Sequence, residues 1–402
     1  MVIITRLPVP AGWIMGLELM TDRMNSEKKK FKLKITGLDP VFMVAWILAI
    51  ISSFFVTPGK GYLEYIDFRS LGLLWGLMVV IQGYRENSVF EKFGAALLKY
   101  VKSSKSLMAV LVFLTFFMSM FITNDVALIT FVPFALLILR SIDRRDMMVW
   151  VVVLQTVAAN LGSMLTPIGN PQNLYMTGIT GMGFWEFVLL MLPLTGLSAL
   201  GLLTAIMVLP VKKGEVSLSK EGVVTRHFGS TRQIVIYSLL FAVAFGCVLR
   251  IIPWQVFVVL VLIVVGGMDV KILLRADYVL LLTFVGFFIF TGNMGNIPKV
   301  KEALQSVLDR REFIISVILS QFISNVPATL MLSGFTERYR ELIMGVNVGG
   351  LGTLIASMAS LISYKQYTAD HKSERGRYLL IFTLVNIAFL ILLAGAKYIL
   401  RL

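Results

Sequence analysis

Long apolar stretches recur along almost the whole chain and limit its possible folds more than any other feature. A helix needs about 20 apolar residues to cross a bilayer, because no water there can satisfy its peptide groups. Such runs occur repeatedly here, and 57% of the 402 residues are hydrophobic while only 15% are charged. The sequence therefore predicts an all-α polytopic membrane protein.

Prolines, glycines and charged residues divide the apolar stretches into segments. The predicted membrane-crossing segments are residues 40–57, 68–83, 147–179, 184–209, 233–251, 254–267, 277–293, 342–363 and 378–400. Residues 86–102 and 298–308 are apolar on one helical face only, which suits helices lying in the membrane interface. We expect residues 1–38 to form a cytoplasmic N-terminal tail and residues 210–232 a cytoplasmic loop.

Two apolar stretches are each interrupted near the middle by a short polar group. Residues 123–125 (Thr-Asn-Asp) interrupt residues 106–139, and residues 324–325 (Ser-Asn) interrupt residues 313–335. Polar groups between apolar arms are unfavourable in hydrocarbon and mark functional positions. Basic residues flank both ends of the first stretch, which favours both ends lying on one side of the membrane. We therefore predict two re-entrant helical hairpins.

Two of the crossing segments are interrupted as well. Residues 166–173 (Thr-Pro-Ile-Gly-Asn-Pro-Gln-Asn) contain two prolines, which stop helical hydrogen bonding. A weaker interruption falls at residues 353–360. The sequence predicts two discontinuous helices with unwound middles.

These features repeat in the same order. Asn160 precedes Thr166 by six residues, and Asn347 precedes Thr353 by six. We expect a first repeat at residues 39–209, a linking helix at 233–253 and a second repeat at 254–402. Five crossings separate the starts of the repeats, and an odd number inverts the second relative to the first.

The positions of the basic residues favour the same topology. With the N-terminus in the cytoplasm, 26 of the 37 lysines and arginines lie on the cytoplasmic side. The net charge of +14 is spread over many short loops, so it does not indicate nucleic-acid binding. We expect a multi-pass protein of the cell membrane, such as a bacterial plasma membrane, in contact with lipid.

Inverted halves would bring the two hairpin tips and two unwound segments to one polar site. Helix N-termini favour anions there, and free carbonyl groups favour cations. An isolated Ser, Thr or Asn commonly does no more than link helices, but a set repeated at matching positions indicates a site. The candidate substrate- and ion-binding residues are Thr123, Asn124, Asp125, Asn160, Thr166, Gly169, Asn170, Asn173, Ser324, Asn325, Thr329, Asn347, Thr353, Ser357 and Ser360.

Asp125 is the only acid deep between apolar arms, and the second tip has Val326 in its place. An intramembrane carboxylate indicates ion binding or proton transfer, although Asp125 could also be the N-cap of the second hairpin arm. We expect a Na+ site near Asn124, Asp125 and Asn170, or a proton on Asp125. No other cofactor is expected.

Several classes of function lack their residues in this sequence. Cys247 is the single cysteine, which excludes an intrachain disulfide and a cysteine metal site. HExxH and GxSxG are both absent, so the chain is not expected to be an enzyme.

Two motifs resemble those of the ion transporter superfamily. They are residues 124–129 (Asn-Asp-Val-Ala-Leu-Ile) with Pro133, and Asn160-Leu-Gly followed by residues 166–173. This superfamily includes citrate transporters, arsenite permeases, divalent-anion/sodium symporters and sodium/proton antiporters. The resemblance covers about residues 40–400 and is closest to the citrate and arsenite-permease branch. It implies a scaffold domain, a transport domain with the site at the hairpin tips, and a homodimer.

The expected function is secondary active transport of a small anion, with a carboxylate such as citrate favoured. Coupling to Na+ or H+ and alternating access are expected. The residues leave open arsenite efflux and sodium/proton antiport on the same fold. A membrane receptor that binds an anion without moving it is the alternative of another class.

Overall fold

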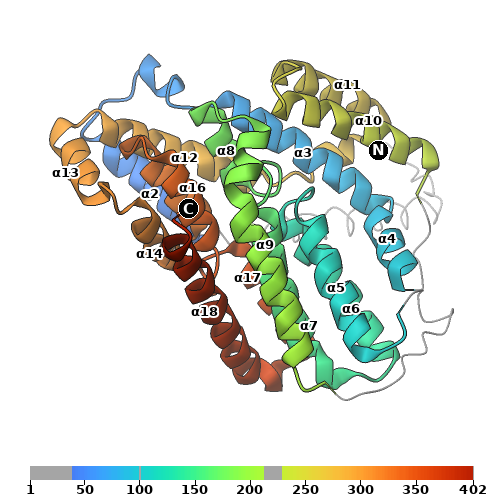
Figure 1. Cartoon of the computed structure of the whole chain (residues 1–402). Coiled ribbons are helices and arrows are strands. Elements are labelled where there is room, and N and C mark those ends of the chain that lie inside the picture. Colours follow the sequence, from blue (N-terminus) through green and yellow to red (C-terminus); the bar gives the residue numbers. More distant parts are fainter. Residues whose placement is uncertain (1–38, 99–100, 212–228, 402) are drawn as a thin grey trace, which may run out of the picture.

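The computed structural model describes residues 39–98, 101–211 and 229–401 (Figure 1). Within these ranges the chain forms seventeen α-helices and no strand, which confirms the all-α prediction. The predicted tail at residues 1–38 and most of the predicted loop at 210–232 lie outside the described residues.

Seven of the described helices are long and apolar enough to cross a membrane, so the chain is a polytopic membrane protein. These helices are α6 (Asn124–Ser141), α7 (Met148–Ser163), α9 (Phe184–Val208), α10 (Thr231–Val248), α11 (Trp254–Leu273), α12 (Tyr278–Gly295) and α18 (Arg375–Ile399).

The remaining helices are shorter or more polar. They are α2 (Pro40–Ser53), α3 (Phe68–Glu86), α4 (Val89–Leu98), α5 (Ser104–Met118), α8 (Pro171–Thr180), α13 (Pro298–Leu308), α14 (Glu312–Ile323), α15 (Asn325–Leu332), α16 (Tyr339–Val348) and α17 (Met358–Asp370). Short 3-10 turns occupy Lys60–Leu63, Arg145–Met147, Ser333–Phe335 and Lys372–Glu374.

Several helix boundaries differ from the sequence prediction; α17, for example, continues to Asp370 rather than ending near residue 363, and two others have a local cause. Helix α2 ends at Ser53 rather than near residue 57, and the hydroxyls of Ser52 and Ser53 both donate to the carbonyl of Ala49 in its last turn. Helix α11 continues past residue 267 to Leu273 through a kink at Asp269. The Asp269 carboxylate there accepts a hydrogen bond from the backbone N–H of Lys271, which lets a helical turn restart beyond the two glycines.

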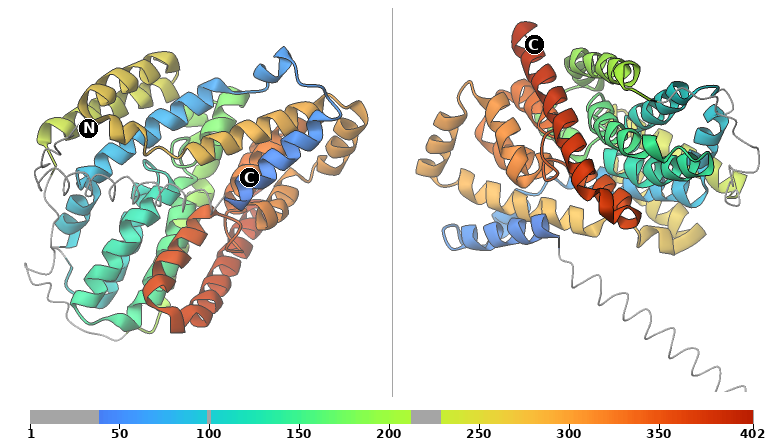
Figure 2. Two further views of the ribbon diagram at one scale, coloured as in Figure 1. Left: turned by 180° about the vertical axis from the view of Figure 1, so that it is seen from behind. Right: turned by 90° about the horizontal axis from the view of Figure 1, so that it is seen from below.

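The helices pack as two groups. In one, α2 packs against α12, and α3 packs against α10 and α11 (Figure 1). In the other, α7 contacts α5, α6, α9, α17 and α18, while α14 and α15 pack against α16. Seen from below, α2 and α12 lie side by side along one edge of the molecule (Figure 2). Helix α7 is 89% buried over its membrane-length window and α11 only 22%, so α7 is the centre of the second group.

Both predicted hairpins and both interruptions are present. Helices α5 and α6 are joined by a turn at residues 119–123, and α14 meets α15 at Ser324, whose φ of +76° lies in the left-handed region. Helix α7 ends at Ser163 and α8 begins at Pro171, while α16 ends at Val348 and α17 begins at Met358. Re-entrance and inversion are orientations relative to the bilayer, and they stay predictions.

Candidate functional site

Four helix N-termini border the candidate site: those of α6, α8, α15 and α17. Their N-cap residues are Thr123, Asn170, Ser324 and Ser357, and none of these side chains caps its own helix. The first backbone N–H groups of a helix lack partners within that helix, and the end carries partial positive charge. An anion or another hydrogen-bond acceptor can therefore be bound at these ends.

Each hairpin tip is tied to the unwound segment of its own half by the backbone. The N–H of Asn124 donates to the carbonyl of Gly169 at 3.3 Å, and the N–H of Asn325 donates to that of Ala356 at 2.9 Å. Gly169 and Ala356 each lie three residues after the repeated threonine. The two halves thus build their tips with the same main-chain bond.

The repeated threonines also make matching bonds. The hydroxyl of Thr166 donates to the carbonyl of Met120, and that of Thr353 donates to Gln321 at 3.0 Å. Each also accepts a hydrogen bond from the backbone N–H three residues later, at 3.1 and 3.2 Å. Both threonines therefore fix the unwound segments to the hairpins. Thr166 is buried, whereas Thr353 is exposed.

Asparagines link the halves across the site. Nδ2 of Asn160 donates to the hydroxyl of Ser360 at 3.3 Å, and Nδ2 of Asn347 donates to Oδ1 of Asn173 at 2.7 Å. Each bond joins the helix before an interruption to the helix after the other interruption. Because 160 and 347 are matching positions, as are 173 and 360, these two bonds are equivalent.

The equivalence ends at the side-chain oxygens of the two asparagines. Oδ1 of Asn160 accepts from Nδ2 of Asn124 at 3.0 Å and from the hydroxyl of Ser357 at 2.9 Å. Oδ1 of Asn347 is buried and has no partner in the described residues. The first hairpin tip is thus hydrogen-bonded to Oδ1 of Asn160 through Asn124. The second tip makes no such bond, so Oδ1 of Asn347 stays free.

Other buried polar atoms near the interruptions also lack partners among the described residues. They include Oδ1 of Asp125, Oδ1 of Asn170 and both polar atoms of the Gln172 side chain. Buried polar atoms in folded proteins nearly always have a partner, and unpaired ones mark places where a ligand or water binds. Carboxylate and amide oxygens are ligands that hard cations prefer.

The position of Asp125 decides one of the alternatives. Helix α6 starts at Asn124 with Thr123 as its N-cap, so Asp125 is the second helical residue. The interpretation of Asp125 as the N-cap is therefore wrong. Its backbone N–H donates to Oδ1 of Asn124 at 3.0 Å. The carboxylate remains available for an ion.

The structure places the other candidates as follows. Asn124, Asn160, Asn170, Asn173, Ser324, Asn325, Thr329, Asn347, Ser357 and Ser360 are buried. Thr123 is partly buried. The hydroxyl of Thr329 donates to the carbonyl of Asn325 within its own helix, at 2.7 Å. A Cβ on Gly169 would lie 2.1 Å from the carbonyl oxygen of Ser163, so only glycine fits there.

Two residues that support the site were missed by the sequence reasoning. Gln321 donates to the carbonyls of Gly349 and Leu351, both at 3.0 Å, and its Oε1 accepts from the N–H of Thr353 at 2.9 Å. It therefore clamps the second unwound segment. Gln172 is 1% exposed at the start of α8. The only sequence signal for either is a glutamine in an apolar setting.

No group of three or more His, Cys, Asp or Glu side chains that could hold a metal occurs in the described part of the chain. A cation here would therefore rest on the isolated carboxylate and amide oxygens noted above. The chemistry of this donor set fits an alkali cation better than a transition metal.

A family profile described as "Citrate transporter" matches residues 27–337. The chain belongs to the citrate transporter family. An uncharacterized transporter of Methanocaldococcus jannaschii is 32% identical over 332 residues, covering 82% of this chain and 89% of that protein. The inner membrane protein YbiR of Escherichia coli is 30% identical over 336 residues, covering 81% and 87%.

A third similarity is shorter. A silicon efflux transporter of Oryza sativa is 34% identical over 131 residues, which is 32% of this chain and 26% of that protein. The family and these relatives make this chain a multi-pass membrane transporter of the citrate transporter family, and not an enzyme.

Proposed function

We propose that this transporter moves a small anion, with a carboxylate such as citrate favoured, by alternating access coupled to Na+ or H+. The observation that carries the proposal is the meeting of uncapped helix N-termini with buried, unpartnered side-chain oxygens. Helix ends supply N–H donors to an anionic substrate, and the oxygens supply ligands to a coupling cation. Both kinds of group occur at the first hairpin tip, with Asp125, and at the start of α8, with Asn170.

Asp125 is the proposed coupling residue. Its Oδ1 is buried without a partner among the described residues, and a charged carboxylate in that position is unfavourable unless it binds a cation or a proton. Na+ bound there would have the Asn170 amide oxygen as a further ligand from the first unwound segment. A proton on Asp125 would serve the same coupling without further ligands.

The backbone bonds between tips and unwound segments support how the site would move. Because Asn124 and Asn325 are each tied to an interruption, a tip and its interrupted helix would shift together. Movement of the second helix group against α2, α3, α10, α11 and α12 would then expose the site to either side. The inverted relation of the two halves is part of this proposal, as are the cytoplasmic N-terminus and the cell-membrane location.

The proposal is tested by uptake of radiolabelled citrate into proteoliposomes with an imposed Na+ or H+ gradient. We expect accumulation under one gradient, and loss of accumulation in Asn124→Ala and Asn325→Ala. Ser198→Ala is a suitable control, because that buried hydroxyl donates only within its own helix α9. Asp125→Asn should abolish the dependence on the gradient; unchanged dependence would remove Asp125 from the coupling role.

Efflux of an uncharged oxyacid is the second candidate. The candidate residues at the tips and interruptions are amides, hydroxyls, a glycine and one carboxylate, with no Lys or Arg among them. Such a site suits arsenous or silicic acid, and one relative is named a silicon efflux transporter and another a putative transporter arsB. Efflux of arsenite from everted vesicles, with no citrate uptake, would favour this candidate. Binding of an anion with no flux of either substrate would favour a receptor.

A further inference from the structure

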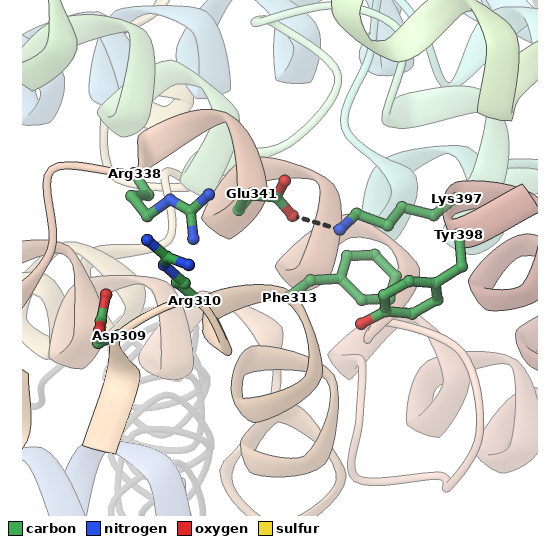
Figure 3. Close-up of a pocket in the computed structure, with 7 residues that line it drawn as sticks. All are labelled: Asp309, Arg310, Phe313, Arg338, Glu341, Lys397 and Tyr398. Atoms are coloured by element: carbon green, nitrogen blue, oxygen red, sulfur yellow. Dashed lines mark ion pairs between the residues drawn. The ribbon is translucent and has the colours of Figure 1, made fainter. Parts of the chain in front are cut away.

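A cavity of about 510 Å³ lies between the starts of α14 and α16 and the end of α18 (Figure 3). The residues that line it are Asp309, Arg310, Phe313, Arg338, Glu341, Lys397 and Tyr398. None of them belongs to the hairpin tips or the unwound segments. The cavity is therefore separate from the candidate transport site, and an inference about it does not depend on the transported substrate.

Lys397 is fixed in one wall of the cavity. Its Nζ lies 2.6 Å from Oε2 of Glu341 and 5.1 and 4.6 Å from the ring centroids of Phe313 and Tyr398. The lysine side chain is only 11% exposed. Packing between two rings and an ion pair of this length hold the ammonium group in place. The charge of Glu341 is thereby neutralised within the wall.

The two arginines are held differently. In Figure 3 the guanidinium groups of Arg310 and Arg338 point toward each other, on the side of the cavity away from Lys397. Nη1 of Arg338 lies 3.7 Å from Oε2 of the nearly buried Glu312, an ion pair that is too long for a hydrogen bond. Across the described residues, neither guanidinium donates a hydrogen bond. Their N–H groups are therefore available to hydrogen-bond acceptors on a bound anion.

The fork of N–H donors on each arginine matches the oxygens of a phosphate group. We propose that this cavity binds a phosphate group, supplied either by an anionic lipid headgroup or by free phosphate. Arg310 and Arg338 bind the phosphate oxygens, and Lys397 with its two rings forms the back wall. Asp309 also lines the cavity, and it leaves the lining with three cationic and two acidic side chains.

The location gives a lipid phosphate direct access. Lys397 and Tyr398 end α18, and Lys and Tyr at the end of a membrane span lie at the level of the lipid headgroups. Exposed apolar side chains continue along two of the three helices that border the cavity, Ile314 and Ile318 on α14 and Ile391 on α18. These side chains offer a surface for acyl chains beside the phosphate. A bound phosphate would connect α14, α16 and α18, and α16 carries Asn347.

The test uses the full chain purified in detergent. Native mass spectrometry measures binding of phosphatidylglycerol and of phosphatidylcholine, and thermal unfolding at constant ionic strength measures binding of inorganic phosphate. The variant Arg310→Gln/Arg338→Gln removes both forks. The control Arg311→Gln/Arg401→Gln removes the same charge from exposed residues that do not line the cavity.

We expect the lining variant to bind at least about tenfold more weakly, because each charge-assisted hydrogen bond contributes roughly a factor of ten. The control variant should bind as the unmodified chain does. Binding of phosphatidylglycerol alone supports a lipid ligand, and binding of inorganic phosphate as well supports a free ligand. Equal binding of phosphatidylcholine, equal loss in both variants, or no binding of any phosphate would overturn the proposal. Arg310→Gln alone serves if the double variant does not fold.

Discussion

Asn160 and Asn347 hold matching positions in the two halves, yet only the side-chain oxygen of Asn160 is occupied. It accepts hydrogen bonds from Asn124 and Ser357, whereas that of Asn347 has no partner among the described residues. The two matching positions thus differ: the acceptor of Asn160 is occupied and that of Asn347 is free. The two asparagines should consequently fail in different ways when replaced.

Asn160→Leu removes the side-chain oxygen that accepts two hydrogen bonds, from Asn124 and Ser357. It also removes the amide group that donates across the site to Ser360. The replacement leaves buried groups of Asn124, Ser357 and Ser360 unpaired, each at a cost of roughly 1–3 kcal/mol. We expect a clear drop in thermal unfolding temperature. Compared with Asn160→Leu, Asn347→Leu should cause a smaller loss of stability and a larger loss of transport. Asn386→Leu is the control for Asn347, because Asn386 makes the same bond to the carbonyl four residues earlier, outside the site. Equal stability losses in Asn160→Leu and Asn347→Leu would contradict this.

Gly169→Ala tests the shape of the first unwound segment. The added methyl would lie 2.1 Å from the Ser163 carbonyl oxygen, so the backbone has to move and the Gly169–Asn124 bond is strained. We expect loss of transport in the proteoliposome assay. Gly196→Ala in α9 meets no atom within 4 Å and should be neutral, or stabilising by up to about 1 kcal/mol. Normal transport by Gly169→Ala would show that this segment adapts easily.

The two repeated threonines allow a matched comparison of burial. Thr166→Val leaves the carbonyl of Met120 without its donor in a buried place, at a cost of roughly 1–3 kcal/mol, while the N–H of Gly169 keeps its bond to the Thr166 carbonyl. Thr353→Val breaks the equivalent bonds at an exposed position, where water can replace the hydroxyl. Thermal unfolding should therefore detect a larger loss for Thr166→Val. A larger loss of thermal stability for Thr353→Val would mean that the Thr353 hydrogen bonds stabilise the protein more than expected for an exposed residue.

Gln321→Met places at the second hairpin the residue that the first hairpin has at the matching position, Met120. The change removes three bonds to the second unwound segment without altering side-chain length much. We expect faster hydrogen exchange at residues 349–357 and no change at residues 164–170. Equal protection of both segments in the variant and the unmodified chain would argue against a clamping role.

Much of the arrangement could be predicted because polar residues and prolines are rare in apolar runs. The breaks at residues 123–125 and 324–325 predicted both helical hairpins, and the prolines after Thr166 predicted the first discontinuous helix. The equal spacing from Asn160 to Thr166 and from Asn347 to Thr353 predicted that these residues occupy matching positions, and the bonds they make came from the structure. Helix ends were less predictable, since the kink that prolongs α11 depends on one local bond at Asp269.

The burial of the site residues and their hydrogen-bond partners could not be predicted from these sequence patterns. Thr166 and Thr353 have identical spacing, but packing buries only the first. Gln321 and Gln172 read as ordinary helix residues, because a single glutamine gives no periodic signal. The difference between the Asn160 and Asn347 oxygens depends on which tip side chain reaches across, and that depends on tertiary packing.

The main-chain bonds from Asn124 to Gly169 and from Asn325 to Ala356 bear on how such a carrier can change over evolution. A peptide N–H and a peptide carbonyl are retained whatever side chain a mutation introduces. The backbone bonds around the substrate site are therefore insensitive to most substitutions at the hairpin tips. These tips read Thr-Asn-Asp in one half and Ser-Asn-Val in the other. Descendants of one ancestral gene could exchange these side chains, and with them their cargo, without having to rebuild the carrier.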